Sequence, residues 1–127
     1  MADARKVERP LSPHLTIYRP QLTSITSILT RISGNALLVG ALLVVAWFLA
    51  AATSQAAFDW MNAAMTSWLG DLVMTLSLWA MWYHALAGVR HLIWDAGIGL
   101  ELDTAEKLGW GVIVGSVVLT LFTVIVV

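Results

Sequence analysis

The chain has 127 residues, of which 59% are hydrophobic and only 12% are charged, with a net charge of −1 and no cysteine. Soluble domains carry about 25% charged residues, so the composition excludes an ordinary soluble enzyme. The near-zero net charge excludes a nucleic-acid-binding protein. The lack of cysteine excludes disulfides, thiolate nucleophiles, covalent c-type haem attachment and an iron–sulfur cluster held by this chain alone.

The first 22 residues are more polar than the rest and hold all three prolines of the chain. Proline at this density disfavours a helix, so residues 1–22 are predicted to form an extended arm on the inner face of a membrane. Apolar residues such as Leu11, Leu15 and Ile17 favour docking of this arm on a partner. A disordered tail is the alternative.

The remaining residues, 23–127, contain three long apolar stretches, and a helix of about 20 apolar residues spans a bilayer. We expect helices over about 24–53, 62–94 and 106–127, the second beginning near Trp60 or Trp68. None of them alternates with a period of two, so β-barrel strands are not expected. The first begins too late and is too long for a cleavable signal peptide. The sequence therefore predicts an all-α integral membrane protein with three transmembrane helices.

Lysine and arginine predict how these helices are oriented. Five of them precede or begin the first span, none lies between the first and second spans, and Arg90 and Lys107 lie between the second and third. The more positive loops stay on the cytoplasmic side. The N-terminus is thus predicted on the cytoplasmic or matrix side of the membrane, and the C-terminus on the opposite side.

The first span carries three polar residues, Ser24, Ser27 and Arg31, at spacings that place them on one helical face. Arginine is well suited to grip a propionate or phosphate, and a hydroxyl one turn away adds a donor for a carbonyl or carboxylate. Arg31 could instead snorkel to the inner interface. Because ionisable groups in a bilayer are costly, the pair is a candidate ligand-binding site.

A sharper signal lies in the second span, where His84, Gly88, His91 and Asp95 follow one another at intervals of four, three and four. These intervals place all four on one narrow stripe of a helix. Neutral imidazole is the commonest metal ligand, and glycine leaves a recess for a planar group. The stripe indicates a haem face, with His84 on the iron, Gly88 making room, His91 near the propionates and Asp95 as a candidate proton relay.

His84 and His91 cannot both bind one iron, because seven residues of helix separate them by roughly 10 Å. A second axial ligand would therefore come from another chain. The alternative is a core histidine hydrogen-bonded to a neighbouring helix. A proton channel is less favoured, because the costly polar groups gather in one half of the membrane instead of crossing it.

Two stretches of the chain resemble the cytochrome b556 subunits, the larger membrane anchors of succinate dehydrogenase (respiratory complex II). They are residues 9–15 with 24–34, and residues 84–97, whose sequence is HALAGVRHLIWDAG. The resemblance implies a subunit that is part of an enzyme only within its complex and has no catalytic residue of its own. Such a subunit takes part in the tricarboxylic acid cycle and electron transport in a bacterial or mitochondrial inner membrane.

The resemblance also implies roles for individual residues. The residue matching His84 is one axial ligand of haem b, and the second, smaller anchor subunit supplies the other. Those matching His91 and Arg31 lie near the haem propionates, and those matching Ser27 and Arg31 help to form the ubiquinone site. An iron–sulfur subunit and a flavoprotein subunit are the remaining partners, besides membrane lipid.

One position departs from the family pattern, because Thr30 stands where the family usually has histidine. Threonine cannot become cationic, so we expect a weaker contact with a propionate there, without loss of haem binding by His84. Two alternatives stay open: a haem-free structural membrane anchor and a fumarate reductase-type anchor.

Overall fold

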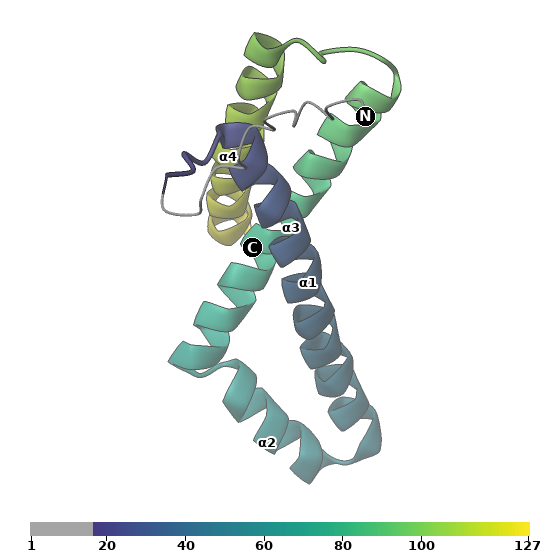
Figure 1. The fold of residues 1–127 in the computed structure, drawn as a ribbon. Coiled ribbons are helices and arrows are strands. Elements are labelled where there is room, and N and C mark those ends of the chain that lie inside the picture. Colours follow the sequence, from purple (N-terminus) through teal and green to yellow (C-terminus); the bar gives the residue numbers. More distant parts are fainter. Residues whose placement is uncertain (1–16) are drawn as a thin grey trace, which may run out of the picture.

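The computed structural model describes residues 17–127, and this part of the chain is built from helices (Figure 1). They are α1 (Leu22–Thr53), α2 (Gln55–Met65), α3 (Trp68–Asp95) and α4 (Leu102–Val126). Three of them, α1, α3 and α4, are long and apolar enough to cross a membrane. The predicted all-α fold with three membrane-spanning helices is therefore confirmed. Most of the predicted arm, residues 1–16, lies outside the described residues.

The helices α1 and α3 cross near the middle of the molecule (Figure 1). The short helix α2 joins their ends on one side of this crossing, and α4 packs along the C-terminal half of α3 on the other side. Large apolar side chains point outward along the whole bundle, including Leu38, Phe48 and Val118, each more than half exposed. Such an apolar surface is typical of helices in contact with lipid hydrocarbon. Within each helix the backbone polar groups bond to one another, as the absence of water in the bilayer core requires.

Two serines act as helix N-caps between the first and second spans. Ser54 begins α2 by accepting a hydrogen bond from the backbone N–H of Ala57 (3.2 Å), and Ser67 begins α3 by accepting one from Gly70 (3.2 Å). Serine is a favoured N-cap because its oxygen satisfies an orphan backbone donor. These caps make 55–65 a separate helix, whereas residues 55–61 were predicted to form a loop and residues 62–65 to begin the second span.

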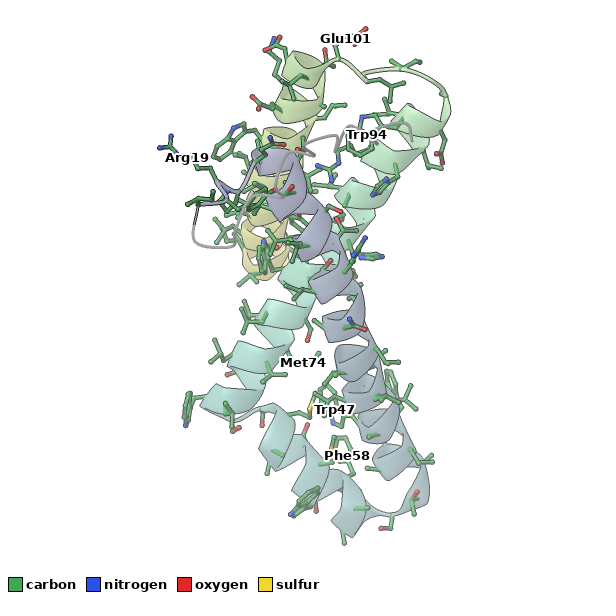
Figure 2. The ribbon with its side chains drawn as sticks, viewed as in Figure 1. Arg19, Trp47, Phe58, Met74, Trp94 and Glu101 are labelled. Atoms are coloured by element: carbon green, nitrogen blue, oxygen red, sulfur yellow. The ribbon has the colours of Figure 1, made fainter. Side chains whose placement is uncertain are left out.

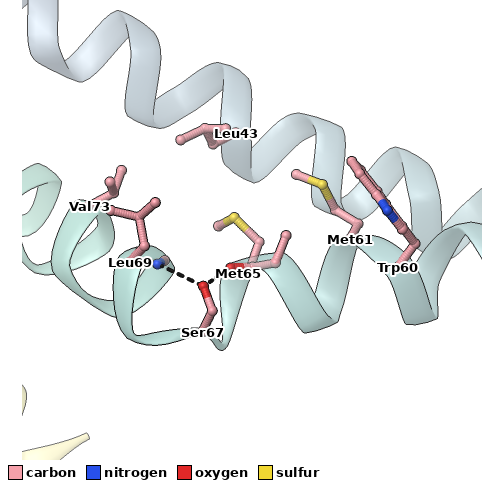
Figure 3. A pocket seen from close by; sticks show the side chains of 9 residues that line it. Leu43, Trp60, Met61, Met65, Ser67, Leu69 and Val73 are labelled. Atoms are coloured by element: carbon pink, nitrogen blue, oxygen red, sulfur yellow. Dashed lines mark hydrogen bonds between the residues drawn. The ribbon is translucent and has the colours of Figure 1, made fainter.

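An open apolar pocket lies between α1 and the corner that α2 and α3 form. Its lining includes Leu43 of α1, Met61 and Met65 of α2, and Val73 of α3 (Figure 3). Figure 2 shows Trp47, Phe58 and Met74 in the triangle that α1, α2 and the first half of α3 enclose. Apolar side chains therefore hold this end of the molecule together without ion pairs among the described residues.

Polar contacts join α3 to α4 at two tryptophans of α3. The indole N–H of Trp79 donates to Ser116 (3.1 Å), and that of Trp82 donates to Thr123 (3.0 Å). Between helices in a bilayer, hydroxyls are frequent partners for such donors. These bonds fix the side of α3 that α4 covers.

Candidate functional site

The imidazole of His84 lies against α1 and is held by it. Its Nδ1 is 3.1 Å from the backbone oxygen of Thr30 and 3.2 Å from the hydroxyl oxygen of Ser33. A carbonyl oxygen can only accept, and the Ser33 hydroxyl already donates to the same carbonyl (2.9 Å). These contacts are therefore those of a ring that is protonated at Nδ1 and donates to Thr30. A neutral ring protonated at Nδ1 has its lone pair at Nε2, which is how histidine ligands are oriented in metal sites. Residues 17–127 form no hydrogen bond to Nε2, so this atom is available as a ligand.

Glycine at position 34 lets the ring approach α1 this closely. A Cβ at this position would lie 3.1 Å from Cε1 of His84, tighter than ordinary van der Waals contact. A larger residue would push the ring away from the Thr30 carbonyl. Gly34 is therefore part of the site, although in the sequence it is notable only as part of the stretch that carries the family resemblance.

The rest of the predicted stripe lies on the surface of α3. Gly88, His91 and Asp95 are exposed, whereas His84 is half-buried. A Cβ at Gly88 would meet no atom within 4 Å, and the ring of His91 stands edge-on to Trp94 with centroids 5.2 Å apart. The described helices of this chain therefore leave the face around Gly88 open.

Ser27 and Arg31 are both exposed on α1. Their spacing from Gly34 places all three on one helical face, and Gly34 touches His84. The predicted residues of α1 thus border the stripe of α3. No hydrogen bond joins Ser27 or Arg31 to that stripe within residues 17–127. No group of three or more metal-binding side chains forms in this part of the chain, so His84 offers its ligand atom alone.

The most deeply buried charge of the described chain was not predicted from the sequence. Arg90 was counted among the loop cations although the predicted second span reached residue 94, and in the structure it lies within α3 and is only 2% exposed. Its Nη1 donates to the hydroxyl of Thr26 on α1 (2.9 Å), and its guanidinium lies 4.7 Å from the ring centre of Trp94. The seven-residue interval between Tyr83 and Arg90 was the available signal, because it places both on one face.

The fold and the site together define a class of protein: a multi-pass membrane protein in which a half-buried histidine lies beside a face of α3 that the described helices leave open. Residues 5–123 match the family described as the succinate dehydrogenase/fumarate reductase transmembrane subunit. The chain therefore belongs to this family, and the resemblance found in the sequence is confirmed.

Individual relatives agree with this assignment. A succinate dehydrogenase cytochrome b556 subunit of Paracoccus denitrificans is 52% identical over 126 residues, covering 99% of this chain and 97% of the relative. A subunit of the same name from Rickettsia bellii is 36% identical over 114 residues, covering 90% and 89%. A succinate dehydrogenase cytochrome b560 subunit of Marchantia polymorpha is 41% identical over 109 residues, covering 82% and 80%.

The contact between Gly34 and His84 yields a prediction for stability. We expect Gly34→Ala to be less stable than Gly111→Ala by about 1 kcal/mol, the value of one hydrogen bond, because the displaced ring loses the Thr30 carbonyl. Gly111 is a matched control, since a Cβ there meets nothing within 4 Å and both changes gain the same helix propensity. Thermal unfolding of the two purified variants in detergent measures the difference, and equal stabilities would contradict the prediction.

Proposed function

We propose that this chain is a membrane anchor subunit of a succinate:ubiquinone oxidoreductase, supplying one axial ligand of haem b and part of the quinone-reduction site. The observation that carries the proposal is the imidazole of His84, whose Nδ1–H is taken by the Thr30 carbonyl. The names of the relatives, which are cytochrome subunits of succinate dehydrogenase, support the same assignment.

The residues around His84 suit a haem. The ring has a defined tautomer with Nε2 available, and Gly88, one turn further along α3, leaves open space where a planar group could approach. His91 lies on the same stripe, and Arg31 on the neighbouring helix could pair with a propionate. When bound, haem b supplies a one-electron carrier within the membrane.

Other chains are needed to complete this site. His84 and His91 are too far apart along α3 to bind the same iron, so a second anchor subunit would provide the opposite axial ligand. The open face around Gly88 and His91 is where that subunit would pack. Because this chain has no cysteine, electrons would arrive from an iron–sulfur subunit, which a flavoprotein subunit supplies by oxidising succinate.

Quinone would bind next to the start of α1, where Ser27 and Arg31 lie on one exposed face. The Ser27 hydroxyl would donate a hydrogen bond to a quinone carbonyl. The Arg31 guanidinium would stabilise the negative charge that develops on this oxygen during reduction. Asp95, exposed at the end of α3, would relay protons from the cytoplasmic or matrix side, where the N-terminus is proposed to lie.

The ligand role of His84 can be tested against His91 on the same stripe. We expect His84→Leu to abolish the b-haem signal in the reduced-minus-oxidised spectrum of the purified complex, because leucine has no lone pair to offer iron. His91→Leu should retain a b-haem signal, since its proposed place is beside the propionates. An unchanged spectrum in His84→Leu would defeat the assignment.

The quinone site can be tested separately from the haem. Ser27→Ala and Arg31→Leu should each lower succinate–quinone reductase activity by about 10²-fold, the usual cost of losing one donor to a developing negative charge. Succinate–dye activity of the same preparations should persist, because it does not need the membrane site. Thr53→Ala is the control, as this hydroxyl bonds only within α1 at its far end. Full quinone reductase activity in both site variants would refute the proposal.

A further inference from the structure

We infer that Tyr83 and Arg90 are positioning residues that grip Thr26 and so hold α1 in the register that brings the Thr30 carbonyl to His84. The inference rests on the proposed role of His84 as a ligand, and it assigns work to residues that bind neither haem nor quinone in the proposed function. Its basis is a set of hydrogen bonds that connects α1 and α3 directly next to the imidazole.

Thr26 is the centre of this set. The phenol of Tyr83 donates to the Thr26 backbone oxygen (3.0 Å), and Nη1 of Arg90 donates to the Thr26 hydroxyl (2.9 Å). Thr26, Tyr83 and Arg90 are 0%, 1% and 2% exposed. All three are therefore enclosed, and no water or lipid headgroup can easily replace these partners.

The grip on Thr26 is transmitted to His84 over a short path. Thr26 and Thr30 are one turn apart on α1, and the Thr30 hydroxyl donates to the Thr26 backbone oxygen (2.8 Å). Tyr83 and His84 are neighbours on α3. Two consecutive side chains of α3 therefore bind two carbonyls of α1 that lie one turn apart.

This arrangement tolerates little sliding. One residue of a helix rises 1.5 Å, and hydrogen bonds weaken steeply when their distance or angle departs from the favoured range. A shift of α1 along α3 by a single residue would therefore break the bonds of Tyr83 and His84 together. Each bond consequently supports the other, and loss of the Tyr83 hydroxyl weakens the hold on the register that orients the imidazole.

Because these residues are buried, breaking their hydrogen bonds to Thr26 costs free energy. Arg90 has no carboxylate partner within residues 17–127, and its Nε has no hydrogen-bond partner. The guanidinium donates a hydrogen bond to the Thr26 hydroxyl and makes a cation–π contact with the ring of Trp94. In a bilayer no water can replace a lost hydrogen-bond partner, so leaving the guanidinium unpaired would cost free energy. Arg90 therefore opposes any motion that takes Thr26 away.

The test compares Tyr83→Phe with Trp82→Phe in the whole complex held in membranes. Tyr83→Phe keeps the ring and removes only the hydroxyl. Trp82→Phe removes a bond of the same length (3.0 Å), but one that joins α3 to α4 and does not reach Thr26. Thr26→Val and Thr26→Ser form a second pair, because valine removes the hydroxyl that Arg90 uses and serine keeps it.

Two readouts report on the imidazole itself. One is the ¹⁵N resonance of His84 Nδ1 in histidine-labelled complex, recorded with reduced haem bound and again in complex prepared without haem. The other is the largest g-value of the oxidised haem, which reports how the axial imidazole is oriented. Tyr83→Phe and Thr26→Val should shift the Nδ1 resonance toward a weaker hydrogen bond and move the g-value. Trp82→Phe and Thr26→Ser should leave both at their wild-type positions.

An unshifted Nδ1 resonance in both Tyr83→Phe and Thr26→Val would overturn the inference, even if both variants were less stable, because the bonds would then be a structural clamp alone. Should Tyr83→Phe fail to assemble, the Thr26 pair decides in the same way. The haem-free spectra keep this result separate from the proposed function: haem retained in His84→Leu would refute ligation by His84, but not the control of its ring by Tyr83.

Discussion

The hydrogen bond from Nδ1 of His84 to the backbone oxygen of Thr30 is the interaction on which the site depends. It decides which ring nitrogen carries the proton, and it turns the other nitrogen into a lone-pair donor. In a bilayer, a polar side chain without a partner is costly, so the carbonyl both relieves this cost and orients the ring. Gly34 permits the close approach, and Thr26, Tyr83 and Arg90 secure the helix that supplies the carbonyl.

The two sides of α3 differ in their contacts. One side packs on α4 through the indoles of Trp79 and Trp82, which makes a stable pair of helices. The side that carries Gly88 and His91 faces away from the rest of the described chain. The chain belongs to a family of transmembrane subunits, and this exposed side of α3 is where we propose that the haem and a second subunit bind.

Much of the fold could be predicted from the sequence, because hydrophobic length and charge segregation mark spans whatever their neighbours are. The stripe of His84 and Gly88 could also be predicted, since spacing alone decides which residues share a helical face. Spacing does not tell which face meets another helix, and for this reason the burial of Arg90 and its bond to Thr26 were missed. The helix 55–65 was missed because its eleven residues, capped by Ser54, are too short to be distinguished from a loop by hydropathy.

The most direct test of the account is a density map of the assembled complex purified from membranes, at a resolution that shows side-chain orientation. We predict planar density joined to Nε2 of His84, with Nδ1 of the same ring facing the Thr30 carbonyl and Gly88 among the residues in contact with the planar group. A map in which Nε2 points into lipid or toward another helix, with the planar group bound elsewhere, would contradict the account.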